Sequence, residues 1–428
     1  MGYRLQKVCR LFLAIWLLCS LPAVSSAYSV FSHEELIDLT WKGLLQPLLL
    51  KRFPQLTPAG LQEAHAYAYG GCVIQDLGYY PFSNEFFSDL THYVRSGDFI
   101  MNLLRNARTA NEYAFALGAL SHYVGDSVGH HDAVNPATAL AFPKLAKKYG
   151  PIVTYDESPH AHIRTEFAFD IDQLSKRRLA PADYLRFIGF KVPARLLAQA
   201  FAETYSLSFR DILGPRRPAI RSYRASVRSF LPRIAYAENV IHRNEFAPDI
   251  ANDSLQIFLD HIARADFQTV WNQYRHKPGI RTHLIALLIR ILPKIGTLSD
   301  LAIKIPTQHT QDLYVKSMNR SIEMYAGLLK QLAGAPDLGP PLPDLDLDTG
   351  EKIQPGTYAL ADKTYARLLH EIATGPQRTV TPGLKQNILD YYSTNATITT
   401  QKNRKAWVQV MKDLDVLRGM PTSARPGI

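Results

Sequence analysis

The sequence contains only three cysteines in its 428 residues. Two of them, Cys9 and Cys19, lie in an N-terminal stretch that we expect to be removed, which leaves Cys72 alone. A single cysteine excludes an internal disulfide and also the thiolate-rich type of zinc site. Any metal site in the mature chain must therefore be built from histidine, aspartate and glutamate.

Long hydrophobic runs are also scarce. The first, Leu11 to Leu18, is too short to cross a bilayer comfortably. It follows the basic residues Arg4, Lys7 and Arg10 and precedes the small residues that end at Ala27, which is the layout of a secretory signal peptide. We expect cleavage after Ala27 and a secreted or periplasmic protein, with an uncleaved anchor as the alternative.

A second apolar run extends from His283 to Lys294 and is also too short to span a membrane. It predicts either a buried core helix or, because Arg290 and Lys294 are nearby, a peripheral membrane contact. The formal net charge of +10 falls to +7 when the three basic residues of the signal are removed. This surplus favours anionic partners such as phospholipid surfaces or nucleic acid, although it is also typical of ordinary soluble proteins.

Alternating strand patterns are rare, whereas apolar residues recur at helical spacing almost throughout, so the predicted fold is mainly α. One apolar stripe runs from Met318 to Leu332 and is closed by Gly334. Five prolines among acidic residues follow and predict an extended linker over 335–356. The expected organisation is a signal peptide (1–27), a multi-helix domain (28–334), this linker, and a small helical extension (357–428).

The most informative motif is His122, Asp126 and His130, which are spaced four residues apart. On an α-helix this spacing places all three side chains on one face. Thr109 and Glu112 form a capping box, so the helix is expected to begin near residue 110. His131 is turned away from this face by about 100°, so helical geometry favours His130 as the metal-facing histidine.

A second pair with the same spacing, His162 and Glu166, follows Ser158 and Pro159, which are typical of a helix N-terminus. One such pair is common on surface helices. Two pairs within 45 residues indicate a metal site, because imidazole and carboxylate are the groups that zinc prefers when thiolates are absent.

These motifs belong to a longer series that resembles the zinc-dependent phospholipase C family, whose fold is shared with S1/P1-type single-strand nucleases. The resemblance is strong over about 28–170, continues as plausible helices to 334, and does not include the tail beyond 340. It rests on residues in the order His33, Asp76, His92, His122, Asp126, His130, His162 and Glu166.

The resemblance implies a mainly α phospholipase C/P1 nuclease-like domain with two to three zinc ions. Asp76, His92 and His122 are then expected to hold one ion, and His130, His162 and Glu166 a second. His33 and a bridging Asp126 are expected to hold the third, close to the second. Family members begin with a zinc-binding tryptophan, whereas cleavage after Ala27 leaves Tyr28 at the N-terminus.

The implied chemistry is phosphodiester hydrolysis by a zinc-bound hydroxide. Asp76 and Asp126 are the catalytic candidates: Asp76 to orient or deprotonate the attacking water, and Asp126 to join two ions. On a phospholipid, the products are diacylglycerol and a phosphorylated head group.

Two other functions fit the same residues. An S1/P1-like nuclease or other phosphodiesterase would bind nucleic acid or another diester, and a nuclease needs aromatic platforms for bases. A non-catalytic, metal-stabilised binding protein would have closed metal coordination. In a helical protein this rich in tyrosine, a core or rim position is favoured over a base platform for the candidates, which are Tyr67, Tyr69, Tyr79, Tyr80 and Phe82.

Overall fold

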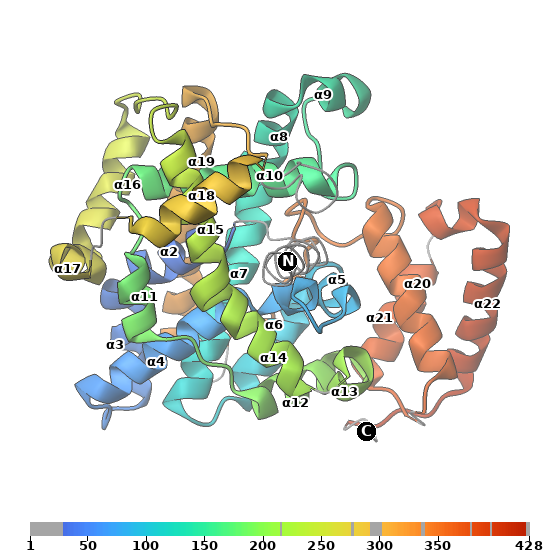
Figure 1. Ribbon diagram of the computed structural model, residues 1–428. Coiled ribbons are helices and arrows are strands. Elements are labelled where there is room, and N and C mark those ends of the chain that lie inside the picture. The colour runs from blue at the N-terminus through green and yellow to red at the C-terminus, as the bar shows by residue number, and fades with distance from the viewer. Residues whose placement is uncertain are drawn as a thin grey trace, which may run out of the picture.

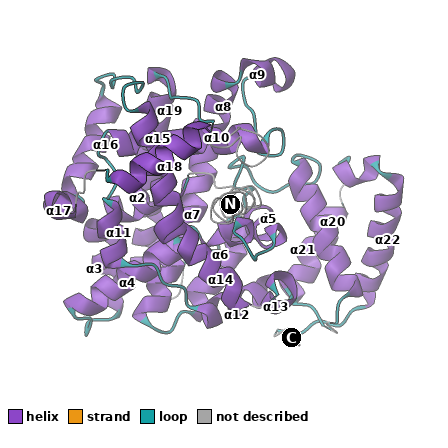
Figure 2. Ribbon diagram, in the orientation of Figure 1, coloured by secondary structure: helices purple, strands orange, loops and turns teal. Residues whose placement is uncertain are grey.

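The computed structural model describes residues 29–424 except 215, 275–277, 292–301, 335–338, 377–378 and 394–395. The expected signal peptide therefore lies outside the described residues. Helices dominate the fold, as predicted (Figures 1 and 2). Among the described residues, extended segments pair only as isolated bridges, Leu345 with Lys352 and Val380 with Thr422. Within the same residues, every helix is too short or too polar to cross a membrane.

Helix α7 (Ala110–Gly129) is the centre of the main helical body, where it packs against α2, α3, α4, α6 and α19. It begins at the predicted capping box: the Thr109 hydroxyl accepts the Glu112 N–H, and the Glu112 carboxylate accepts the Thr109 N–H. Close approach to α4 (Pro58–Gly71) requires glycine. A Cβ at Gly118 would lie 2.1 Å from the Ala68 carbonyl oxygen, and one at Gly71 would lie 2.1 Å from that of Phe115.

Further helical elements surround α7 in the first part of the chain. They are α2 (Val30–Thr40), η1 (Trp41–Leu45), α3 (Gln46–Arg52), η2 (Ile74–Tyr79), α5 (Glu85–Tyr93), α6 (Ser96–Asn106), η3 (His130–Val134), α8 (Asn135–Ala141), α9 (Pro143–Tyr149), α10 (Pro159–Ser175), α11 (Ala182–Ile188) and α12 (Ala194–Tyr205). Pro159 occupies the first turn of α10, as predicted, although the Ser158 side chain makes no capping hydrogen bond.

The second half of the main body contains α13 (Phe209–Leu213), α14 (Arg216–Ala225), η4 (Ser226–Phe230), α15 (Leu231–His242), α16 (Asp253–Arg264), α17 (Asp266–Tyr274), α18 (Ile280–Ile291) and α19 (Gln308–Gly334). The apolar stripe of α19 faces the core, with Met318, Ile322, Tyr325 and Leu329 buried. The described part of α19 runs to Gly334, and residues 335–338 lie outside the described residues, so the predicted end of this helix stays a prediction.

Beyond α19, residues 339–358 contain no helix and cross the surface of the main body. This segment, which we call the crossing segment, is closely packed: Leu347 is buried and Leu345 nearly so. It leads to α20 (Ala359–Thr374), α21 (Pro382–Tyr392), η6 (Thr399–Lys402) and α22 (Arg404–Gly419). These helices stand together at one side of the molecule, where α20 packs on α5 (Figure 1).

Candidate metal centre

Four predicted ligands meet where α7, α5 and η2 come together. Within this first group, the Nε2 atom of His92 lies 3.4 Å from Asp76 Oδ1 and 3.2 Å from Asp126 Oδ2. The Nε2 atom of His122 lies 2.9 Å from Asp126 Oδ2 and 3.9 Å from Asp76 Oδ1. All four side chains are buried, so their polar atoms face one another and not solvent.

Helix α2 brings His33 to this first group. Its N-terminus is held by Asp170 of α10, whose carboxylate accepts the backbone N–H groups of Phe31 and Ser32, each at 3.0 Å. The Nε2 atom of His33 then lies 3.1 Å from Asp126 Oδ1, and its ring stacks on that of His122. His33 and Asp126, the ligands expected for the third ion, thus lie at the first group. Asp126 is placed between His33 on one side and His92 and His122 on the other.

The protonation of the histidines shows that the first group fits a metal ion. Nδ1 of His92 lies 2.7 Å from the Ser88 carbonyl oxygen, and Nδ1 of His122 lies 3.0 Å from that of Cys72. A carbonyl only accepts, so both Nδ1 atoms carry the proton and, in the neutral rings, both Nε2 atoms present lone pairs. These lone pairs face each other across 3.4 Å, which is repulsive unless a cation lies between them.

The electrostatics of the first group also require positive charge. Burial opposes ionisation of Asp126, but His122, His33 and His92 hold the pKa of its carboxyl group well below the usual range. Burial likewise lowers the pKa of His92, but Asp126 and Asp76 outweigh it and raise that pKa to about 10. A buried carboxylate pair that attracts a proton this strongly is equally suited to a divalent cation.

The second group is built from α10 and the end of α7. His162 and Glu166 lie one turn apart on α10, with 2.7 Å between Nε2 and Oε1. His130 begins the π-helical turn η3, and its Nε2 atom lies 3.2 Å from that of His162 and 3.4 Å from Glu166 Oε1. Burial lowers the pKa of His162, which favours the neutral, metal-binding form, and raises that of Glu166 to about 8. Three ligand atoms therefore face one point.

The neighbouring histidine, His131, is not part of this group. Its side chain is 51% exposed and pairs with Asp132. His130, in contrast, is buried with His162 and Glu166. Because α7 keeps its period through Gly129 before η3 begins, the face defined by His122 and Asp126 still includes His130.

One functional residue was missed by the sequence analysis. Asp348 lies within the stretch expected to be a linker, yet it is fully buried at the second group. Its Oδ1 atom lies 3.1 Å from His130 Nδ1 and 3.9 Å from His162 Nε2. Burial opposes its ionisation, but His130, His162 and the Tyr358 hydroxyl outweigh this and lower the pKa of Asp348 to about 2. The position of Asp348 at the second group depends on a long-range contact, for which the local sequence contains no signal.

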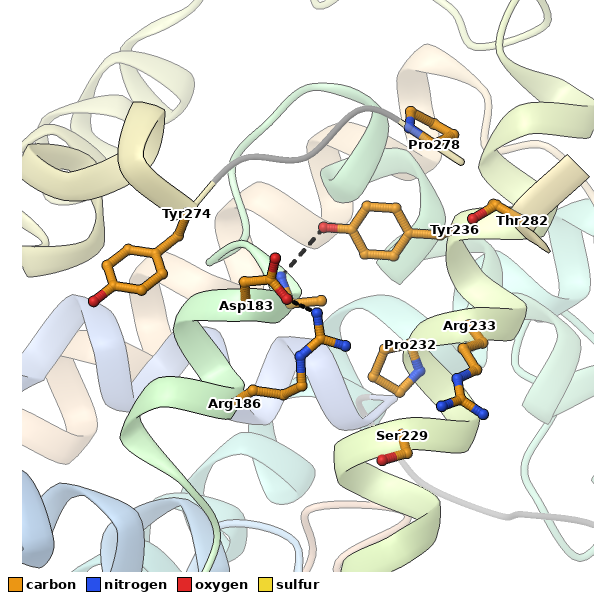
Figure 3. A pocket seen from close by; sticks show the side chains of 10 residues that line it. Asp183, Arg186, Ser229, Pro232, Arg233, Tyr236, Tyr274, Pro278 and Thr282 are labelled. Carbon is orange, nitrogen blue, oxygen red and sulfur yellow. Dashed lines mark hydrogen bonds and ion pairs between the residues drawn. The ribbon is translucent and has the colours of Figure 1, made fainter. Parts of the chain in front are cut away.

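A surface pocket elsewhere on the main body is separate from both groups (Figure 3). Its walls include Asp183 and Arg186, which form an ion pair, and Tyr236, whose hydroxyl accepts the Ala182 N–H. Its described lining contains none of the predicted metal ligands. The metal centre is therefore defined by the two buried groups and not by this pocket.

Comparison with protein families agrees with the geometry of the two groups. Residues 32–212 match the family described as zinc dependent phospholipase C. The matched region includes all eight predicted ligands and ends before the crossing segment that carries Asp348. Searches of curated proteins and of solved structures found no match.

Proposed function

Because residues 32–212 match the zinc-dependent phospholipase C family, we propose that this protein is a secreted phospholipase C. It hydrolyses a phospholipid on the glycerol side of phosphorus and releases diacylglycerol and a phosphorylated head group. The observation that carries this proposal is the convergence of buried imidazoles and carboxylates at two places: His33, Asp76, His92, His122 and Asp126 at the first, and His130 and His162 with Glu166 and Asp348 at the second. Secretion rests on the signal-peptide pattern of residues 1–27.

Each part of the centre has a distinct role in this proposal. The first group with His33 would supply ligands for up to two zinc ions, with Asp126 central to it, and His130, His162 and Glu166 would hold one more. When bound, zinc lowers the pKa of water and neutralises charge that develops on phosphoryl oxygens. Asp76, whose carboxylate lies 3.4 Å from His92 Nε2 in the first group, would orient the attacking water and accept its proton.

Helix α18 is the proposed point of contact with the lipid surface. Five large apolar residues lie exposed on it, at spacings of three and four that place them along one face: Ile280, Leu284, Leu287, Leu288 and Ile291. Arg281 and Arg290 are exposed on the same helix and can meet lipid phosphates. A short amphipathic helix with this composition is typical of peripheral membrane binding, which a phospholipid substrate requires.

Aromatic side chains favour a lipid over a nucleic acid. Stacking of bases needs exposed rings. Of the candidate platforms, Tyr69, Tyr79 and Tyr80 are buried and Tyr67 is partly buried, whereas Phe82 is exposed. A single exposed ring offers little for a run of stacked bases.

The experiment is a parallel assay of the purified zinc-loaded protein on phosphatidylcholine vesicles and on single-stranded DNA. We expect diacylglycerol from the vesicles, loss of the reaction with a chelator, and recovery with added zinc. Nucleotide release from DNA with no diacylglycerol from any common phospholipid contradicts the proposal in favour of the nuclease.

The role of α18 is tested with Leu284→Ser/Leu288→Ser, and with Val408→Ser/Val416→Ser as the matched control on exposed apolar residues of α22. We expect the α18 variant to sediment less with vesicles while hydrolysing a monomeric short-chain lipid normally. Equal sedimentation of both variants contradicts a contact through α18.

A further inference from the structure

The crossing segment reaches into the metal centre through Asp348, although it lies beyond the family match. We propose that Asp348 is a positioning residue of the second group: its carboxylate accepts the Nδ1–H of His130 and directs Nε2 of that ring at the ion. The inference rests on metal binding by the second group, which is part of the proposed function, and not on the substrate.

The two nitrogens of His130 distinguish a positioning residue from a ligand. Nε2 faces His162 and Glu166, at 3.2 and 3.4 Å. Asp348 approaches the other nitrogen, Nδ1, at 3.1 Å, and lies farther from His162 than Glu166 does, 3.9 against 2.7 Å. Because one ion binds one nitrogen of an imidazole, an ion at Nε2 would have Glu166 on its own side of the ring and Asp348 on the opposite side. An ion at Nδ1 would instead make Asp348 a ligand together with His130 and His162.

The first group uses the same arrangement. His92 and His122 each place Nδ1 against a backbone carbonyl oxygen, of Ser88 and Cys72 respectively. Such partners fix the tautomer and the orientation of a metal-binding imidazole, and a carboxylate partner also makes the ring more basic. Asp348 is the corresponding partner for His130.

Asp348 is itself held by several independent contacts. Its Oδ2 atom accepts the Tyr155 N–H at 2.9 Å and the Tyr358 hydroxyl. Its carbonyl oxygen accepts an Asn135 side-chain N–H at 2.7 Å, and its own N–H donates to Asp346 Oδ1 at 2.9 Å. The remaining oxygen, Oδ1, is therefore held by a fixed carboxylate at 3.1 Å from His130 Nδ1.

The crossing segment is placed by a close approach to α7. Gly350 adopts φ +71°, and a Cβ there would lie 2.3 Å from the Ser127 carbonyl oxygen. On the same segment, the Leu347 N–H donates to the carbonyl oxygen of His92 at 3.2 Å. The segment thus contacts the backbone of one proposed ligand and the side chain of another, which makes it part of the metal centre.

The test uses the full mature chain, with Asp348→Ala, Asp348→Asn and the control Asp344→Asn. Asp344 belongs to the same segment, but its carboxylate accepts the Asp98 N–H away from the ions. Competition with a zinc chelator measures the affinity of each ion. We expect Asp348→Ala to keep every ion but to bind one of them about 10- to 100-fold more weakly. Asp348→Asn should lie between this variant and the wild type, because an amide oxygen still accepts Nδ1–H.

The second readout is the ring N–H resonance in zinc-loaded protein labelled with ¹⁵N-histidine. In the structure, His130 Nδ1 and Asp348 Oδ1 lie 3.1 Å apart without forming a hydrogen bond, so the proposal requires the ring to align when the ion binds. A carboxylate-bonded Nδ1–H resonance should disappear in His130→Ala and Asp348→Ala and persist in Asp344→Asn.

Two results overturn the proposal. The first is unchanged affinity and an unchanged resonance in Asp348→Ala. The second is complete loss of one ion in both Asp348→Ala and Asp348→Asn, which would make Asp348 a ligand. If Asp348→Ala does not fold, Tyr358→Phe replaces it: the same ion should bind several-fold more weakly, and equal affinity contradicts the proposal. A wild-type protein without ions refutes the proposed function as well, whereas an ion-loaded wild type with unaffected variants refutes this inference alone.

Discussion

The most damaging single substitution should be Asp126→Asn. The carboxylate of Asp126 is fully buried and lies 3.1, 3.2 and 2.9 Å from the Nε2 atoms of His33, His92 and His122. The amide is almost the same size, so the substitution removes the negative charge with little change in packing. It also replaces one acceptor oxygen by an N–H₂ group, which has no lone pair available to bind a cation.

The size of the effect follows from the charge removed. Two unit charges about 4 Å apart attract each other by about 4 kcal/mol at an effective dielectric constant near 20, and a divalent ion gains roughly twice as much. Removal of water from the ion and the carboxylate offsets part of this gain. A net loss of only about 3 kcal/mol weakens binding by more than 100-fold, because about 1.4 kcal/mol corresponds to a factor of ten.

Zinc analysis after dialysis against a weak chelator measures this effect, together with diacylglycerol release and a circular dichroism spectrum. Asp126→Asn should lose the two ions of the first group and the activity together while staying helical. The matched control is Asp132→Asn, which removes a carboxylate in the adjacent turn that pairs with Arg320 and faces no predicted ligand. Full zinc content and full rate in Asp126→Asn would refute its role as the bridge.

Three further predictions concern the second group, the packing and the pH dependence. His130→Ala should lose one zinc ion and the activity, whereas His131→Ala should keep that zinc ion and the activity. The reverse result in metal analysis would make His131 the ligand. Gly118→Ala should destabilise the protein by about 1–3 kcal/mol or more through overpacking. Gly327→Ala adds a methyl group in open space on α19 and should stabilise the protein by up to about 1 kcal/mol, and thermal melts of both variants measure the two effects. Burial raises the pKa of Asp172 from 3.8 to about 6, so the unfolded chain loses this proton first and the free energy of unfolding falls by up to about 3 kcal/mol as pH rises from about 4 to 6. In thermal melts across that range, Asp172→Asn should lack this pH-dependent part of the free energy of unfolding. A stability difference between Asp172→Asn and the wild type that stays the same at every pH contradicts the prediction.

The mainly α fold and the region matched to the family were predictable because they depend on local patterns. The capping box at Thr109 begins α7 where predicted. The helical period also determines that His122, Asp126 and His130 share a face, and that His162 and Glu166 lie one turn apart. Such relations need only the geometry of a single helix.

The composition of each group was less accessible from sequence. The resemblance implied that His33 and Asp126 hold a third ion close to the second, but helical spacing did not show that both residues also lie beside His122. This position depends on how α2 is held by Asp170 of α10, a contact across 138 residues. Local spacing contains no information about such a contact.

The sequence by itself therefore determined which side chains can bind metal and which of them share a helix, because the helical repeat fixes neighbours three and four residues apart. Only the tertiary structure decided which helices meet around Asp126 and that the crossing segment brings Asp348 to His130. Prolines and acidic residues are typical of a solvated linker, and nothing in that local pattern distinguishes a linker from a buried segment. The difference arises because the glycine at position 350 and the hydrogen bonds of Asp348 fit surfaces formed by α5, α7 and the loop before α10.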